Sequence, residues 1–256
     1  MHVLTESRYL LGMQIAYIGQ FRIGVVILAA ASTPQAVGTY AVASRMAEGL
    51  VIVAAAISAS TLPLLRADRG SAHVREIELI ARRAYRLALL ASTTLVAILS
   101  LAAPLWLGLL FPGYPDAALV FVPVGLTIVG YFANSQTTAF LNATHHDRQA
   151  TTSAVVGLLV AVAASIGLVG FGAMGVAVGR LLGEIARAII EIVAVALRSS
   201  WLAWGMLRSW LWLLPAVATI VVPDITGWGL VQAVVGMAVV GLFAGLAARS
   251  WSRGDA

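Results

Sequence analysis

Seven charged side chains interrupt apolar stretches of this sequence, and their types and spacing give the clearest indication of chemistry. Four of them follow one another at steps of four, three and four residues: Arg180, Glu184, Arg187 and Glu191. These steps place all four on one narrow stripe of an α-helix, with alternating sign. Such a stripe either pairs its own charges and locks a helix bundle together, or lines a polar cavity for an ionic ligand.

The other three charges are Arg22, Arg45 and Glu48. Arg45 and Glu48 are three residues apart, so they share a helix face and can pair. Arg22 has no carboxylate three or four residues away, so its partner must come from another helix, from water or from a ligand. Four arginines and three glutamates sum to +1, which favours an anion, and the planar guanidinium suits phosphate.

We therefore expect Arg22, Arg45 and Arg180 to bind the anionic part of a ligand. The carboxylates Glu48, Glu184 and Glu191, together with Arg187, are expected to pair charges, to tune the binding arginines or to hold a coupling cation. We expect these groups to bind and not to catalyse, so the protein is not expected to be an enzyme.

A second polar pattern adds uncharged groups at helical spacing. The four side chains Tyr131, Asn134, Thr138 and Asn142 recur every three to four residues and so line one helix face. This face is either the wall of a wet cavity or a set of hydrogen bonds between helices. In the first case Tyr131, Asn134 and Thr138 contribute to substrate binding.

Metal and cofactor chemistry finds no support in the sequence. The chain has no cysteine, and the adjacent histidines His145 and His146 would point apart on most backbones. Nucleotide-binding loops, serine-hydrolase elbows and zinc-protease motifs are absent from the sequence. We expect no metal and no cofactor.

The composition predicts an all-α membrane protein. Hydrophobic residues make up 61% of the chain and charged residues 11%, whereas a soluble domain carries roughly 25% charged residues. The apolar runs are long and do not alternate, which indicates helices and not a barrel. We expect eight spans, at residues 10–31, 37–62, 87–110, 117–141, 152–169, 175–197, 207–222 and 229–247.

The twelve arginines in loops, at the chain ends and at the start of the seventh span predict the orientation. All twelve fall in segments that lie on one side of the membrane if the helices alternate, and the turns at 32–36, 111–116, 170–174 and 223–228 contain none. Both termini are therefore expected in the cytoplasm. The net charge of +5 reflects this topology, so we do not expect nucleic-acid binding. The longest basic segment is expected to form a short surface helix from residue 71.

Glycines on the sixth expected span predict close packing. Gly175, Gly179 and Gly183 recur every four residues, which makes a stripe beside the charged one. Small residues at this spacing let a second helix approach closely.

Several short motifs carry a family resemblance. They are VGTYAVASRMAE at 37–48, TLP at 61–63, AP at 103–104 followed by LF at 110–111 and Tyr114, and FGAMGVA at 171–177, with Glu184 downstream. In this order the motifs resemble the C-terminal lobe of the polysaccharide transporter family of flippases, from about residue 10 to 198. There are two departures from the family pattern. Arg22 has no acid nearby in the sequence, where many members carry an acidic residue close to a basic one, and the outer turn 111–114 differs from the usual Phe-Gly.

The resemblance implies a fold and a function. Residues 1–198 would form one six-helix lobe of the flippase superfamily, and 199–256 two further helices with a short tail. The chain would be a component of a bacterial inner-membrane flippase that moves polyprenyl-diphosphate-linked oligosaccharide by alternating access. Its partners would be membrane lipid, the lipid-linked saccharide, and a missing N-terminal lobe or a second copy of the chain.

Three other functions stay open at this point. A drug/cation antiporter of the same superfamily is the runner-up, and a half-lobe without transport is the third. A membrane-bound saccharide polymerase or ligase is disfavoured, because such enzymes usually place catalysis on a large outer loop. No expected outer turn here exceeds six residues.

Overall fold

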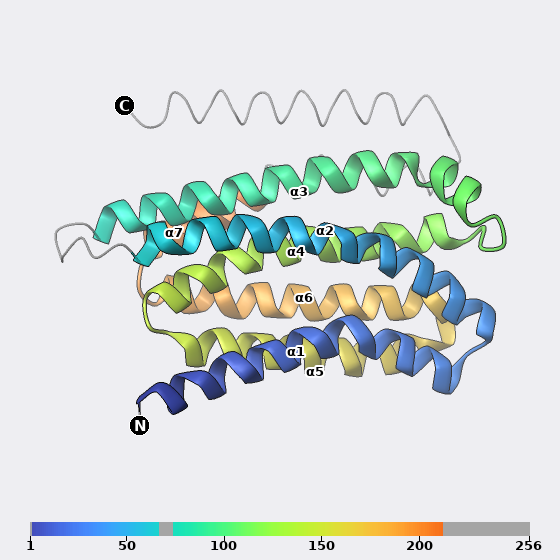
Figure 1. Cartoon of the computed structure of the whole chain (residues 1–256), viewed down its shortest axis with the longest axis horizontal. Helices are drawn as coiled ribbons and strands as arrows, with labels where there is room; N and C mark the ends of the chain where they lie inside the picture. Colours follow the sequence, from blue (N-terminus) through green and yellow to red (C-terminus); the bar gives the residue numbers. More distant parts are fainter. Residues whose placement is uncertain (1, 67–73, 212–256) are drawn as a thin grey trace.

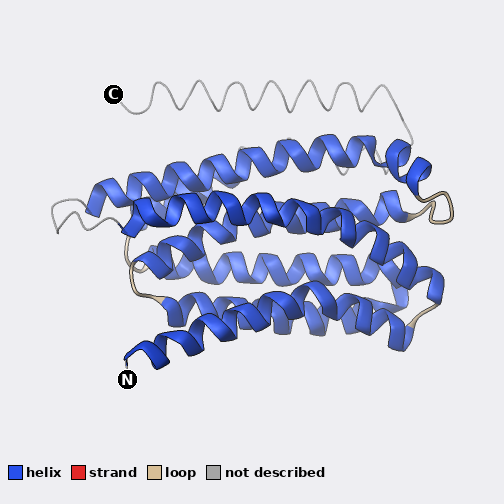
Figure 2. Cartoon of the chain, viewed as in Figure 1, coloured by secondary structure: helices blue, strands red, loops and turns tan. Residues whose placement is uncertain are grey.

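The structure, a computed structural model, describes residues 2–66 and 74–211 (Figure 1). In these ranges the chain is helical apart from short turns and forms no strand (Figure 2). The helices are α1 (His2–Ala31), α2 (Pro34–Arg66), α3 (Val74–Leu110), α4 (Ala117–Ala143), α5 (Asp147–Leu168), α6 (Gly172–Ala196) and α7 (Ser200–Leu211), with a short 3-10 turn, η2 (Val169–Phe171), before α6.

Five helical segments are long and apolar enough to cross a membrane. They are Leu11–Ala31, Pro34–Leu65, Arg75–Leu110, Ala117–Ala143 and Asp147–Ala196, the last of which contains both α5 and α6. The outer surface of the bundle carries exposed aliphatic side chains such as Ile18, Leu105 and Leu159. Both features agree with the predicted helical membrane protein. The eighth predicted span and most of the seventh lie outside the described residues.

Helix α4 forms the centre of the bundle. It packs against α2, α3 and α6, and most of its side chains are buried. Helix α1 packs chiefly against α5, and less extensively against α2 and α6 (Figure 1). One face of α1 and of α2 therefore has no helix of the described chain against it.

Helices α5 and α6 form a tight antiparallel hairpin, and glycines make it possible. Gly172 starts α6 at a φ of +60°, a value that favours glycine. A methyl group on Gly179 would lie 2.5 Å from the Ser165 nitrogen, and one on Gly183 would lie 2.5 Å from the Ala161 Cβ. The predicted glycine stripe is thus confirmed as a close helix contact.

Two residues of the motif segments, Gly38 and Tyr40, also take part in close glycine contacts. A methyl group on Gly38 would lie 2.3 Å from the ring of Tyr114, and one on Gly24 would lie 2.5 Å from the hydroxyl of Tyr40. The first contact joins the start of α2 to the turn before α4. Two of the segments that carry the family resemblance therefore meet in space.

The predicted surface helix is not a separate element. The structure continues it into the third span, as the 37-residue helix α3. No glycine or proline occurs between residues 74 and 103, so nothing ends the helix there. Its first turns carry the basic residues, and Arg82 lies 4.7 Å from the ring centroid of Trp201 on α7. Trp210 on α7 donates a hydrogen bond to the Tyr85 hydroxyl at 2.7 Å.

Candidate functional site

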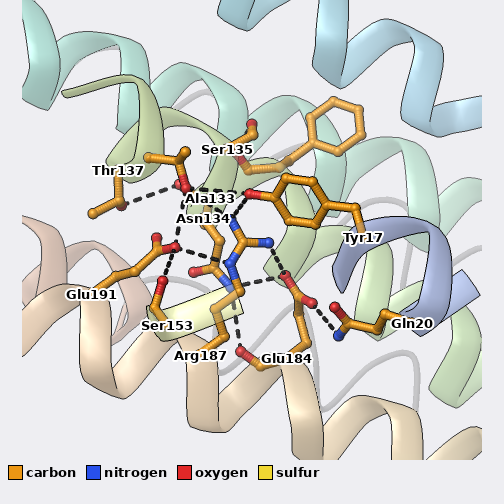
Figure 3. A network of polar contacts seen from close by, with 12 residues as sticks. Tyr17, Gln20, Ala133, Asn134, Ser135, Thr137, Ser153, Glu184, Arg187 and Glu191 are labelled. Carbon is orange, nitrogen blue, oxygen red and sulfur yellow. Dashed lines mark hydrogen bonds and ion pairs between the residues drawn. The ribbon is translucent and has the colours of Figure 1, made fainter. Parts of the chain in front are cut away.

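A buried polar network centred on Arg187 joins four helices of the bundle (Figure 3). The Arg187 side chain has no exposed surface. Its Nε donates to Oε1 of Glu191 at 2.9 Å, and its Nη1 donates to Oε1 of Glu184 at 3.4 Å. Both carboxylates come from the same stripe of α6 as Arg187 itself, as the steps of three and four residues predicted.

Two further contacts of Arg187 reach other helices. Its Nη2 donates to the hydroxyl of Tyr17 on α1 at 2.5 Å and to Oγ1 of Thr138 on α4 at 2.8 Å. The guanidinium carbon also lies 4.6 Å from the centre of the Tyr17 ring. Every nitrogen of this buried guanidinium therefore has an acceptor, which is the condition under which a buried charge is tolerated.

Neutral donors add to both carboxylates, although Oε2 of Glu191 is buried and has no hydrogen-bond partner among the described residues. Glu184 accepts from Asn134 of α4 at 2.8 Å and from Gln20 of α1 at 2.7 Å. Glu191 accepts through Oε1 from Thr138 at 3.0 Å and from Ser153 of α5 at 3.0 Å. Helices α1, α4, α5 and α6 are thus linked by one hydrogen-bonded network in the low-dielectric interior, where such bonds are strong.

The network selects between alternatives that the sequence leaves open. Glu184, Arg187 and Glu191 pair their charges, so this part of the stripe holds the bundle together. On α4, Asn134 and Thr138 make the hydrogen bonds between helices that were one of the two expectations. Their part in substrate binding stays a prediction.

Tyr131 stands at the edge of the network and contacts α1 through its ring. The ring packs edge-on against Tyr17 and Phe21, with centroids 5.9 and 5.7 Å apart. Asn142, the last member of the α4 face, has a buried Oδ1 without a hydrogen-bond partner. The four polar residues of α4 therefore share a face but have different surroundings.

Arg180, the first member of the charged stripe, does not join the network. Its side chain is 2% exposed, and its Nε and Nη1 have no hydrogen-bond partner. The guanidinium lies 4.3 Å from the ring centroid of Phe21 on α1. Glu184, one turn along α6, points instead to Arg187, Asn134 and Gln20.

Arg22 and Glu48 form an ion pair between α1 and α2. Nη1 of Arg22 lies 3.6 Å from Oε1 of Glu48, and the two side chains are 54% and 20% exposed. The predicted pair of Arg45 with Glu48 is wrong, because Glu48 turns toward α1. Arg45 is exposed and makes no ion pair with any residue that the structure describes.

The two exposed arginines lie at similar depth in their helices. Arg22 comes nine residues before the end of α1 at Ala31, and Arg45 eleven residues after the start of α2 at Pro34. At 1.5 Å per residue these distances are about 13 and 16 Å. Half of a ~30 Å hydrocarbon core is about 15 Å, so these distances fit the predicted position near mid-depth, which stays a prediction.

The turn between α4 and α5 holds the two histidines. His145 has a φ of +59°, and Nδ1 of His146 lies 3.1 Å from Oγ1 of Thr144. Burial, and then the charge of Arg198, lower the pKa of His146 below its usual range. Among the described residues, no group of three or more histidine, aspartate or glutamate side chains is arranged to hold a metal ion.

Sequence reasoning missed four contributors to these sites. Tyr17, Gln20 and Phe21 of α1 and Ser153 of α5 supply partners to the charges on α6. A signal existed for the first two, because a tyrosine and a glutamine three residues apart in an apolar span indicate a polar helix face. Ser153 gives no such signal, since serine occurs often in membrane helices.

Comparison of the chain with protein-family models, with curated proteins and with solved structures gives no match.

Proposed function

We propose that this chain is one lobe of a flippase that moves polyprenyl-diphosphate-linked oligosaccharide across the bacterial inner membrane by alternating access. The observation that carries the proposal is the exposure of Arg22 and Arg45 at mid-depth on the α1–α2 face. The motifs that resemble the C-terminal lobe of the polysaccharide transporter family support the same proposal.

The surroundings of Arg22 explain why this face needs a covering partner. Leu11, Ile15, Ile18 and Val26 are exposed on α1, and their spacing puts them on the same stripe as Arg22. An arginine in the middle of a lipid-facing stripe would be costly. The face is therefore proposed to pack against a second lobe, with water and substrate around the arginines.

The charge of this face favours an anionic substrate. Arg22, Arg45 and Glu48 sum to +1, and only one of the two guanidinium groups is paired. A diphosphate offers several oxygens to the planar donors of arginine. A small-cation antiporter is disfavoured by the same positive excess.

The buried network gives the lobe the stiffness that alternating access requires. Tyr17 and Gln20 tie α1 to α6, on the side of α1 that faces away from the exposed stripe. A movement of α1 relative to α6 would break buried charge-assisted bonds. The lobe is therefore proposed to rock as one body against its partner.

The second lobe is proposed to come from another polypeptide or from a second copy of this chain. In the first case, a separate protein with a complementary six-helix bundle covers α1 and α2. In the second, the α1–α2 faces of two copies meet. Purification of the chain from its native membrane, followed by mass determination of the intact complex, distinguishes the two.

The experiment that tests the function is export of lipid-linked saccharide by cells that carry Arg22→Ala or Arg45→Ala. We expect export to be lost while the protein stays in the membrane at its normal level. Arg148→Ala is the matched control, because Arg148 is an exposed arginine in the first turn of α5, away from the α1–α2 face. Normal export by both α1–α2 variants would refute the proposal.

A further inference from the structure

Arg180 lies in the interior of the bundle and has no counter-ion among the residues that the structure describes. Its Nε and Nη1 are sealed from the outside and make no hydrogen bond to any described residue. The ring of Phe21 at 4.3 Å offsets part of the cost but accepts no conventional hydrogen bond.

The nearest carboxylate on α6 cannot fill this role. Glu184 lies one turn from Arg180, but Oε1 already accepts from Arg187 and Asn134, and Oε2 accepts from Gln20 at 2.7 Å. Turning Glu184 toward Arg180 would leave Arg187 and two amides short of an acceptor. The structure therefore keeps Arg180 free of the network.

Two hydroxyl groups on α2 are also buried without a hydrogen-bond partner among the described residues. The Tyr40 hydroxyl and the Ser44 Oγ are buried and make no hydrogen bond within the described part of the chain. Tyr40 packs against Gly24, which is one turn from Phe21 on the same face of α1. Because α1 and α2 run antiparallel, Ser44, one turn after Tyr40, lies near the depth of Phe21. Helix α2 also contacts α6 directly.

Three donor groups without a partner among the described residues thus lie on α2 and α6, which contact each other and α1. One is a guanidinium and two are hydroxyls, a set that matches an oxyanion and not a cation. We infer that this junction is a binding site for a phosphate group, with Arg180 supplying the charge and Tyr40 and Ser44 supplying neutral hydrogen bonds.

This site is separate from the exposed α1–α2 face. Arg45 follows Ser44 directly in the sequence but is exposed, so the two side chains leave α2 in different directions. The inference also goes beyond the proposed function, because phosphate binding to the purified chain requires no transport and no second lobe. A failed export experiment would leave it standing, and a failed binding experiment would leave the α1–α2 proposal standing.

The first test is the thermal stability of the purified chain in phosphatidylcholine nanodiscs, with inorganic phosphate as the probe. We expect phosphate to raise the Tm in a saturable way, with sodium chloride at equal ionic strength as the reference. In Arg180→Gln the Tm without phosphate rises, because an unpaired buried charge is removed, and the response to phosphate is lost. Arg148→Gln, the exposed control, keeps the wild-type response.

If the Arg180 variant does not fold, the site can still be tested with the variants Tyr40→Phe and Ser44→Ala. Each removes one hydroxyl and leaves the shape of the side chain nearly unchanged. We expect the double variant to bind phosphate about tenfold more weakly, as the loss of one or two hydrogen bonds to a charged ligand requires. Unchanged phosphate affinity in this variant would show that the two hydroxyls do not bind phosphate.

A second arm identifies the source of the phosphate group. Nanodiscs that contain phosphatidylglycerol, and nanodiscs that contain a short polyprenyl diphosphate, are compared with phosphatidylcholine alone. A stabilisation that disappears in Arg180→Gln supports the site, and the probe that produces it names the source. If inorganic phosphate and both lipids leave the wild-type Tm unchanged, or shift wild type and Arg180→Gln equally, the inference is overturned.

Discussion

Arg187 and Glu191 lie one turn apart on α6, joined by a 2.9 Å hydrogen bond, and neither side chain has any exposed surface. The pair is held from outside α6 by Tyr17 of α1, Thr138 of α4 and Ser153 of α5. A buried ion pair of this kind is sensitive to the loss of one partner, because the remaining charge is left without compensation.

The first prediction concerns the centre of the network. Arg187→Met leaves Glu184 and Glu191 buried without their cation, and we expect a loss of about 3–5 kcal/mol of stability. The measurement is unfolding of the purified protein in mild detergent. The control is the triple variant with Glu184→Gln and Glu191→Gln added, which removes the orphaned charges and recovers most of the loss. Equal instability of single and triple variants would contradict this account.

The second prediction concerns the attachment of α1. Tyr17→Phe combined with Gln20→Leu removes the two direct hydrogen bonds from α1 to the α6 charges. We expect each change to cost about 1–3 kcal/mol, because each leaves a buried charged group short of a partner. Hydrogen–deuterium exchange should increase in α1 and stay unchanged in the α5–α6 hairpin. Faster exchange in α5 and α6 alone would show that α1 is held by other contacts.

A third prediction follows from the α5–α6 contact. A methyl group on Gly183 would meet the Ala161 Cβ and the Gly157 carbonyl at 2.5 Å, whereas one on Gly49 would meet nothing within 4 Å. We expect Gly183→Ala to destabilise the protein by about 1–3 kcal/mol through overpacking. Gly49→Ala is the matched control and is expected to be neutral or slightly stabilising. Comparable effects at both positions would rule out the steric explanation.

Substitutions in the Arg22–Glu48 ion pair are expected to affect export much more than stability. The pair is partly exposed, so we expect Arg22→Gln to change the Tm little, in line with a contribution of about 0–1 kcal/mol. We expect the exchange variant, Arg22→Glu with Glu48→Arg, to keep the ion pair and still fail to export lipid-linked saccharide. Restored export in the exchange variant would mean that the pair matters and the position of the arginine does not.

His146 provides a prediction about pH. Its pKa is lowered by burial and by the charge of Arg198, so the folded protein binds this proton less readily than the unfolded chain does. The resulting stabilisation is present above the unfolded pKa of about 6.5 and is lost as the pH falls below that value. Arg198→Gln should raise the pKa of His146 toward its usual range without restoring it fully. NMR titration of the His146 ring measures both values.

The sequence predicted the helices well because each apolar stretch is bounded by a clear break. Residues 32–33 interrupt α1 and α2, and residues 111–116 interrupt α3 and α4. The boundary between α5 and α6 was harder to place, since η2 continues the helical path up to Gly172. The basic segment was predicted to be helical from residue 71, but as a surface helix separate from the third span, whereas the structure continues both as α3.

The candidate sites were predictable only within one helix. Spacing of three and four residues placed Glu184, Arg187 and Glu191 together, and the structure agrees. The same rule paired Arg45 with Glu48 and failed. It considers one helix at a time, whereas Glu48 pairs with Arg22 on α1. Partners from distant segments, such as Tyr17 for Arg187, depend on how helices pack and leave little trace in local spacing.

The link between Tyr17 and Arg187 joins residues that are synthesised 170 positions apart. Helix α1 leaves the ribosome long before α6. Tyr17 and Gln20 therefore lack their α6 hydrogen-bond partners until α6 has been synthesised. Four charges make α6 a poor candidate for unassisted insertion, since each costs about 2.5–3.5 kcal/mol at the centre of a membrane helix. We therefore expect α6 to enter the bilayer only when α1, α4 and α5 are already inserted and can pair with its charges. The order in which the helices are synthesised then becomes part of how the bundle assembles.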